Sequence, residues 1–150
     1  MAFVSKYTVF GNPIAQSKSP SIHQMFAEQA GLKIEYDRTL ATKDNFIPTL
    51  EEFFLNADAK GCNVTSPFKE QVAKWVNELS DSAKIAGAVN TVIRKRDGTF
   101  LGDTTDGQGL VQDLMRLGVP VKGARILLLG AGGAARGVLQ SILALEPRLL

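Results

Sequence analysis

Residues 125–137 read RILLLGAGGAARG, and this stretch decides what kind of fold the C-terminal part of the chain should adopt. An apolar run at residues 124–129 leads without interruption into a cluster of glycines. Apolar residues then recur at helical spacing through residues 138–145. A strand, a glycine turn and a helix in this order are typical of α/β proteins, so we predict a strand at 124–129 followed directly by a helix.

The glycine turn has the composition that the diphosphate of a dinucleotide requires. Gly130 permits a tight turn, Gly132 lets the backbone come close to the diphosphate, and Gly133 keeps the helix entry narrow. The free N–H groups and the dipole of the following helix favour an anion at this place. Together with Ala131 and Ala134, these glycines are therefore predicted to bind a dinucleotide cofactor.

A plain strand-to-helix turn is the alternative interpretation of this stretch. Because the glycines follow an apolar run and open a helix, the sequence context favours the cofactor site by about three to one. The residue that reads the cofactor's ribose lies about 20 residues further along in such folds. That position falls beyond Leu150, so the residues leave the choice between NADP and NAD open.

Upstream of the glycine turn, short apolar runs alternate with helical patterns. Predicted strands cover residues 7–10, 34–40, 61–64, 88–93 and 99–101, the last two joined by a hairpin turn at 96–98. Predicted helices begin after the caps Ser19 and Asp44, after Pro67, and at Ser80 and Thr105. This alternation predicts an α/β fold with a mostly parallel sheet flanked by helices, followed by the first βα unit of a Rossmann-type dinucleotide-binding domain.

The strongest domain boundary lies near residues 103–123. Before it, the chain contains several βα units and the hairpin, and after it one new βα unit begins. We therefore expect a first domain at residues 1–105, and a linking helix with the start of a dinucleotide-binding domain at residues 106–150. One strand and one helix cannot cover both faces of a sheet, so the second domain is expected to be truncated.

The composition argues against several classes of protein. The chain has 150 residues, of which 45% are hydrophobic and 21% charged, and a formal net charge of +2. Its densest basic run, residues 94–96, precedes an Asp-Gly pair and is interpreted as a hairpin tip rather than a nucleic-acid patch, by about five to one. A single cysteine, Cys62, expected to be buried, and a single histidine, His23, disfavour a disulfide and a zinc site. Without a membrane-length run or a signal peptide, a cytoplasmic protein with no membrane or nucleic-acid partner is expected.

Polar residues gather at the ends of the predicted strands of the first domain. The four groups are Ser17-Lys18-Ser19, Asn63-Val64-Thr65 with Lys69, Asn90-Thr91, and Asp103-Thr104-Thr105-Asp106-Gly107. Ligands of open α/β sheets bind outside the carboxyl ends of the strands. Hydroxyl, carboxamide, ammonium and carboxylate groups in this place suit a small ligand that is polyhydroxylated and anionic.

Each polar group also has a structural interpretation. Such side chains cap helices or form turns, and taken singly each is interpreted that way by about two to one. Lys69 differs from the others, because a cation near the start of a helix opposes the helix dipole. Its position therefore indicates a role other than the stability of its helix.

In their order and spacing these motifs resemble the shikimate dehydrogenases, oxidoreductases that reduce 3-dehydroshikimate to shikimate with NADPH. The matching stretches are residues 9–14, 17–20, 61–65, 67–70, 87–91, 102–103, 105–107 and 130–137. The resemblance implies a substrate-binding α/β domain, a Rossmann-type cofactor domain, and a place in the shikimate pathway of aromatic amino-acid biosynthesis. It implies NADP as the cofactor, with NAD not excluded.

The resemblance also implies a role for the residues at the matching positions. Ser17 and Ser19 correspond to hydroxyls that hold the substrate carboxylate. Asn63, Thr65, Asn90 and Asp106 correspond to the groups that bind the ring hydroxyls, and Lys69 and Asp106 to the catalytic pair. Gly130, Ala131, Gly132, Gly133 and Ala134 correspond to the diphosphate turn. Which member of the pair transfers the proton is left open, since Asp106 can instead orient the hydroxyl and the ammonium.

Two positions depart from the family pattern, and two alternative functions stay open. Ser66 stands where Val is more common and Thr104 where Asn is usual, but neither is assigned a chemical role. The alternatives are a quinate/shikimate dehydrogenase using NAD, and a non-catalytic substrate-binding module. A monomer or homodimer is expected. The 150 residues alone are expected to be inactive, because their cofactor domain is incomplete.

Overall fold

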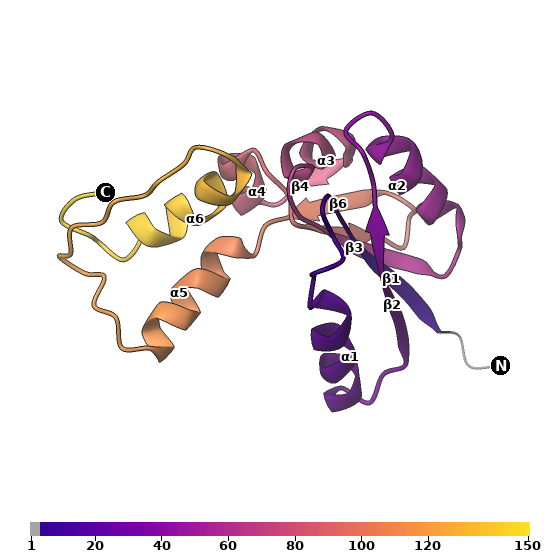
Figure 1. The fold of residues 1–150 in the computed structure, drawn as a ribbon, viewed down its shortest axis with the longest axis horizontal. Coiled ribbons are helices and arrows are strands. Elements are labelled where there is room, and N and C mark those ends of the chain that lie inside the picture. Colours follow the sequence, from indigo (N-terminus) through magenta and orange to yellow (C-terminus); the bar gives the residue numbers. More distant parts are fainter. Residues whose placement is uncertain (1–3) are drawn as a thin grey trace.

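The alternating strands and helices of the first two thirds of the chain produce one six-stranded sheet in the computed structural model, which describes residues 4–150 (Figure 1). Its strands are β1 (Ser5–Gly11), β2 (Ile34–Leu40), β3 (Ala59–Val64), β4 (Glu78–Leu79), β5 (Thr91–Arg94) and β6 (Phe100–Asp103). They lie in the order β2-β1-β3-β5-β6-β4. β1 is parallel to β2 and β3, β4 is parallel to β6, and β5 runs antiparallel to both of its neighbours. The predicted mostly parallel sheet and the β5–β6 hairpin are confirmed.

The helices flank this sheet and extend from one end of it. They are α1 (Ser19–Gln29), α2 (Phe46–Leu55), α3 (Lys69–Trp75), α4 (Asp81–Ala86), α5 (Asp106–Arg116) and α6 (Gly133–Leu143). Two predicted caps are wrong. Lys18, not Ser19, precedes α1, because the Ser17 hydroxyl accepts the Ser19 amide and closes the turn one residue earlier. Asn45, not Asp44, precedes α2, because the Asn45 side chain closes the preceding turn. No helix described in residues 4–150 is long and apolar enough to cross a membrane.

One face of the sheet carries the apolar core. Phe10 projects from β1 toward α2, where its ring packs edge-on against Phe46 with the centroids 5.6 Å apart. Phe46 stacks on Phe68 at 4.4 Å, and all three rings are fully buried. Cys62 of β3 is buried too, as predicted, and its burial raises the pKa of the thiol. Aromatic packing thus fixes α2 and α3 on this face, and holds Lys69, the neighbour of Phe68, in place.

The opposite face of the sheet is polar. The strand register places Tyr7 of β1 beside Tyr36 of β2, and Asn63 of β3 beside Thr91 of β5. Successive side chains of a strand point to opposite faces, so these four residues share the face that Phe10 does not occupy. α1 packs on this face along β1 and β2 (Figure 1). The polar side chains of β3 and β5 are therefore accessible beside α1.

The predicted strand at residues 124–129 is wrong. Within the described part of the chain, this run makes a single strand-like bridge, from Arg125 to Leu149, and Leu127 and Leu129 are 83% and 84% exposed. A strand needs neighbours that pair with its N–H and C=O groups, and among residues 4–150 this run has almost none. The predicted helix does form, as α6, and it packs against α4 and α5 (Figure 1).

Candidate active site

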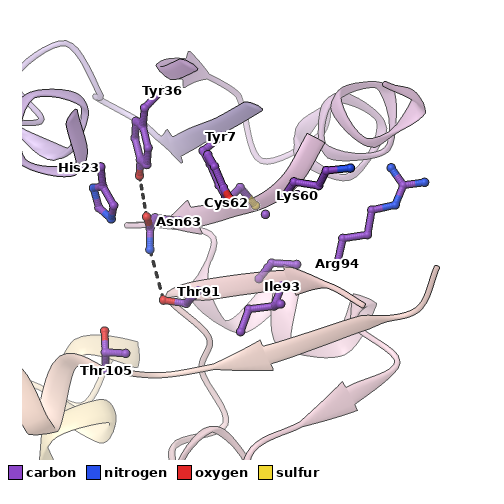
Figure 2. Close-up of a pocket in the computed structure, with 12 residues that line it drawn as sticks. Tyr7, His23, Tyr36, Lys60, Cys62, Asn63, Thr91, Ile93, Arg94 and Thr105 are labelled. Carbon is purple, nitrogen blue, oxygen red and sulfur yellow. Dashed lines mark hydrogen bonds between the residues drawn. The ribbon is translucent and has the colours of Figure 1, made fainter. Parts of the chain in front are cut away.

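A cavity of about 530 Å³ opens on the polar face of the sheet (Figure 2). Its lining includes Tyr36, His23, Asn63, Thr91 and Thr105 toward one end, and Lys60 and Arg94 toward the other. The two cations donate to backbone carbonyls near the end of α2, and this contact accounts for their position. The hydroxyl and amide groups of the first end are the candidates for ligand binding.

Lys69 and Asp106 form an ion pair next to Thr105. Lys69 is the first residue of α3 and Asp106 the first of α5, and 2.5 Å separates Nζ of the lysine from Oδ2 of the aspartate. Their side chains are 13% and 24% exposed, so the pair is shielded but accessible. The Lys69 carbonyl accepts the amide of Val89, which ties the start of α3 to the segment before β5. The unfavourable position of this cation on its helix is therefore compensated by a carboxylate from a distant part of the chain.

Asn90 connects the ion pair to the sheet. Its side-chain amide donates to Oδ1 of Asp106 at 2.8 Å and to Oγ1 of Thr105 at 2.9 Å. Its backbone is fixed between two strands, because its N–H donates to Asp103 and its carbonyl accepts from Val64. The side chain of Asn90 therefore holds the second oxygen of the carboxylate that Lys69 contacts.

Asn63 and Tyr36 continue this network along the cavity (Figure 2). The hydroxyl of Tyr36 donates to Oδ1 of Asn63 at 2.6 Å, and Nδ2 of Asn63 lies 3.2 Å from both Oγ1 of Thr91 and the carbonyl of Asn90. Burial raises the pKa of Tyr36 well above its usual range, with a smaller contribution from Cys62, while a hydrogen bond with Ser19 acts in the opposite direction. Tyr36 therefore keeps its proton at neutral pH.

The two predicted serines lie on the loop before α1, at the margin of the network. Ser19 neighbours Tyr36, and its carbonyl accepts from Nδ1 of His23 at 2.9 Å. Ser17 accepts the Ser19 amide through its hydroxyl, and its carbonyl is held by the guanidinium of Arg38. The loop is thus anchored to β2 through Arg38, which places both hydroxyls on the α1 side of the sheet.

Thr65 follows β3 directly and is positioned by its backbone. Its N–H donates to the carbonyl of Phe10 at 2.9 Å, and its own carbonyl accepts from Phe68 at 3.1 Å. Its methyl group fills the space where a side chain on Gly11 would lie, so Gly11 is required at the end of β1. The predicted role of the Thr65 hydroxyl in ligand binding stays a prediction.

The glycine turn before α6 is open at its tip and closely packed behind it. Gly130 has a φ of +118°, which favours glycine, and among the described residues no atom lies within 4 Å of a Cβ placed on Gly130 or Gly132. No described side chain caps the first N–H groups of α6, and these can therefore bind an anion. A Cβ on Gly133 would lie 3.3 Å from Cβ of Lys69. Gly133 thus lets α6 approach the start of α3, in addition to the role predicted for it at the turn.

α6 also covers the other member of the ion pair. A Cβ on Gly137 would lie 3.3 Å from Oδ2 of Asp106, and Arg136 forms an ion pair with Glu70, the neighbour of Lys69. Gly137 therefore packs on the start of α5, and not on a strand at residues 124–129, which does not form among the described residues.

Two residues of the cavity were missed as functional candidates. Tyr36 lies in the middle of a strand, and nothing in its local sequence distinguishes it from a structural aromatic residue. His23 was considered only as a metal ligand, whereas its ring stacks on Tyr36 with centroids 4.4 Å apart. Both reach the site through the packing of α1 on β2, which local sequence patterns do not reveal.

Known proteins of one family are similar to the chain over nearly its whole length. Residues 9–92 match the family model of the shikimate dehydrogenase substrate binding domain. Over 144 residues the chain is 55% identical to a shikimate dehydrogenase (NADP(+)) of Photobacterium profundum. The aligned stretch covers 96% of this chain and 52% of that protein. The chain spans about half the length of the curated relatives it matches.

Solved structures share the fold over nearly the whole chain. A shikimate dehydrogenase from Aquifex aeolicus superposes with a TM-score of 0.90 at 34% identity, covering 99% of this chain and 55% of that one. One from Thermus thermophilus, solved in complex with NADP(H) and shikimate, has a TM-score of 0.87 at 32% identity and covers 97% of this chain and 54% of that one.

Proposed function

The chain belongs to the shikimate dehydrogenase substrate-binding domain family, and on this basis we propose that it forms the substrate-binding and catalytic part of an NADP-dependent shikimate dehydrogenase. The proposed reaction is the reversible reduction of the ring ketone of 3-dehydroshikimate to the hydroxyl of shikimate. The observation that carries the proposal is the Lys69–Asp106 ion pair, which Asn90 and Asn63 join to the polar end of the cavity.

Lys69 is proposed to manage the proton at the ketone oxygen. One N–H of its ammonium is held by Asp106, and the others can point to a ligand oxygen. The positive charge polarises the ketone, and the oxygen takes a proton from Lys69 as the alcohol forms. In the reverse direction Lys69 takes that proton back. Asp106 keeps the ammonium oriented and accepts from a ring hydroxyl.

The remaining polar groups are proposed to orient the substrate. Asn63, Thr65, Asn90 and Asp106 bind the ring hydroxyls, and Ser17 and Ser19 bind the carboxylate. The position of Ser19 beside Tyr36 and the anchoring of the Ser17 carbonyl by Arg38 support this arrangement. A loop held in this way loses little conformational freedom when a ligand binds.

Residues 130–134 are proposed to hold the diphosphate of the cofactor. The positive φ of Gly130, the open space at Gly132 and the uncapped N–H groups of α6 fit such a group. When bound, the cofactor supplies the hydride that reduces the ring ketone. α6 packs on Lys69 through Gly133 and on Asp106 through Gly137, so the turn and the ion pair have a fixed relation.

The proposed domain division places the ion pair across a boundary. Residues 1–105 form the substrate-binding and catalytic domain with Lys69, and residues 106–150 form the linking helix and the start of the cofactor domain with Asp106. The whole enzyme is proposed to act as a monomer or homodimer. Because α6 packs on both α5 and α4, it connects the two parts.

The decisive experiment compares Lys69→Ala with Lys74→Ala in the chain extended by its natural sequence to the length of its relatives. Lys69→Ala should lower kcat for shikimate oxidation by about a hundredfold or more, because proton transfer by a positioned side chain contributes this much. The melting temperature should change little. Lys74 is exposed on the same helix, and Lys74→Ala should keep the normal kcat. A Lys69→Ala enzyme with near-normal kcat contradicts the proposal.

Calorimetry on residues 1–150 tests the binding roles separately. Shikimate should bind, and Ser17→Ala should weaken the binding of shikimate more than the binding of an analogue that lacks the carboxylate. NADP should bind too weakly to measure. The few hydrogen bonds that N–H groups of the turn can donate contribute about 1 kcal/mol each, which does not offset the roughly 4–15 kcal/mol that the loss of translational and rotational freedom costs on association. Turnover by these 150 residues at the rate of the extended enzyme contradicts the proposed division of the cofactor site.

A further inference from the structure

An ion pair joins the start of α6 to the start of α3. Arg136, the only charged residue of α6, pairs there with Glu70, the neighbour of Lys69. We propose that Arg136 is a positioning residue: through Glu70 it fixes the diphosphate turn relative to Lys69, and so aligns a bound cofactor with the substrate. The inference rests on the proposed function for the identity of the cofactor, but the anchoring of α6 by this pair does not.

The face of α6 that packs on the rest of the chain carries its smallest residues. Gly133, Gly137 and Ser141 follow one another at four-residue spacing, and therefore share one face of the helix. A Cβ on Gly133 would lie 3.3 Å from Cβ of Lys69, and a Cβ on Gly107 would lie 2.8 Å from the carbonyl of Gly137. Such a face comes close to its neighbours but has no large side chains that interlock with grooves. It therefore resists a small shift of α6 along or about its axis only weakly.

Arg136 provides the polar contact that holds this face in one position. Within residues 4–150, the structure shows no hydrogen bond and no second ion pair between α6 and residues 4–116. The existing pair joins Nη2 of Arg136 to Oε1 of Glu70. The position of α6 along α3 therefore depends on these two side chains.

Both partners lie at helix ends that favour their charges. Glu70 is in the first turn of α3, where the helix dipole stabilises a carboxylate. Nη1 of Arg136 lies 3.6 Å from the place of a Cβ on Gly87, the residue that ends α4 in the left-handed conformation. The end of a helix favours a cation, and the start of α6 lies beside α4 (Figure 1). The guanidinium is thus held between the start of α3 and the end of α4.

The conformation of Arg136 is determined by these two contacts. Its Nε is buried and has no hydrogen-bond partner among the described residues, although the side chain as a whole is 40% exposed. A buried donor without a partner is unfavourable, so Nε itself does not select this conformation. Solvent screens an exposed ion pair, which therefore contributes little to the stability of a fold. The pair with Glu70 is thus better suited to set the position of α6 than to hold the fold together.

The position of α6 matters for the reaction because its start carries the diphosphate turn. Gly133 belongs to the turn and is also the residue of α6 that approaches Lys69. A cofactor held at the turn is therefore placed relative to Lys69 by the position of α6. A displacement of reacting groups by about 1 Å can lower a rate about a hundredfold. Loss of the pair should therefore slow hydride transfer and weaken cofactor binding, and leave shikimate binding unchanged.

The positioning role is tested in the chain extended by its natural sequence to the length of its relatives. Arg136→Leu retains much of the packing of the arginine stem. It should lower kcat for shikimate oxidation about tenfold and raise the KM for NADP about fivefold, with the KM for shikimate unchanged. The isotope effect with shikimate deuterated at the reacting carbon should rise, because hydride transfer becomes slower relative to the other steps. Arg116→Leu, which breaks an exposed ion pair within α5, should leave all these values unchanged.

A double variant decides whether the two residues act through each other. Glu70→Gln should reproduce the effects of Arg136→Leu, and the two substitutions together should be no worse than the worse single one, because the pair is already broken. Effects that multiply in the double variant overturn the proposal, since Glu70 then acts on its neighbour Lys69 without Arg136. So does a normal kcat in Arg136→Leu, or an equal rise of both KM values.

Hydrogen exchange in residues 1–150 tests the anchoring of α6 without any ligand. Arg136→Leu should speed the exchange of the α6 amides about fivefold relative to the amides of the β1–β3 sheet, and Arg116→Leu should not. Unchanged protection of α6 in Arg136→Leu overturns the anchoring. If the unchanged extended chain does not oxidise shikimate with NADP, the proposed function fails, and the exchange result still decides whether Arg136 anchors α6.

Discussion

Two apolar runs of similar length behave differently in this molecule. β1 has a parallel partner on each side, and its residues Val9 and Phe10 are buried. Residues 124–129 are at least as apolar, yet the run stays extended without a ladder and exposes Leu127 and Leu129. An apolar sequence therefore specifies a strand only where neighbouring strands take up its backbone groups, since a single strand cannot pair with itself.

The helix that follows residues 124–129 forms without the neighbours that the strand would need. α6 forms although the strand before it does not, because a helix satisfies its backbone hydrogen bonds internally. It is stabilised by packing on α4 and α5 rather than on a sheet of its own. The glycine turn is consequently positioned by the packing of α6 on α4 and α5, next to Lys69 and Asp106.

The largest expected difference between the two regions is in thiol reactivity. In Leu127→Cys, the new thiol should react with a disulfide reagent as a free thiol does, while Cys62 of β3 in the same molecule should react more than a thousandfold more slowly. Cys62 is buried and its pKa is raised, so it reacts only when the sheet opens, at a cost of about 5 kcal/mol or more. The absorbance of the released reagent should rise in two phases, a fast one from the new thiol and a slow one from Cys62. Comparable rates would mean that the sheet is no more stable than the C-terminal run.

Truncation of a core aromatic residue should have the next largest effect. Phe46→Ala removes a ring that is stacked on Phe68 and packed against Phe10, and should lower the free energy of unfolding by about 3–5 kcal/mol. Leu55→Ala is the control on the same helix, because Leu55 is 84% exposed. Urea unfolding of both variants measures the difference. Equal losses would show that the aromatic cluster does not dominate the core.

A substitution at the contact between α5 and α6 should have an intermediate effect on the free energy of unfolding. Gly107→Ala places a Cβ 2.3 Å from Oγ of Ser141 and 2.8 Å from the carbonyl of Gly137, so it should cost about 1–3 kcal/mol and loosen α6 from α5. Gly109→Ala on the same helix meets open space among the described residues, and should stabilise α5 by up to about 1 kcal/mol. Hydrogen exchange of the α6 amides is the measurement. A Gly107→Ala chain with unchanged α6 protection would contradict this packing.

The smallest effect is expected within the C-terminal run itself. Leu129→Ala should change the free energy of unfolding of residues 1–150 by less than about 0.5 kcal/mol, because the side chain is already exposed. The same substitution in the chain extended to the length of its relatives is the informative comparison. There a loss of about 2–5 kcal/mol is expected if the run becomes a buried strand of the cofactor domain. Urea unfolding of the two forms, with and without the substitution, gives both values.

Local sequence patterns were sufficient for most of the secondary structure. The spacing of Ile34 to Leu40 predicted β2 to the residue, and the cation at the start of α3 distinguished Lys69 from the other polar residues. These signals are local, because they depend on side-chain alternation and on the dipole of a single helix. The roles of the predicted site residues in ligand binding stay predictions.

The tertiary structure alone decided which of these groups meet and in what orientation. The partner of Lys69 lies 37 positions away, the hydrogen bonds through Thr91 depend on a strand register, and Tyr36 and His23 reach the cavity through the packing of α1 on β2. The same holds for residues 124–129, where composition predicted a strand and the lack of neighbours prevented it. Sequence by itself determined the helices, which make their backbone hydrogen bonds internally, and the chemical groups that they carry. Pairing between elements requires partners distant in the chain, and these are set only when the whole fold has formed.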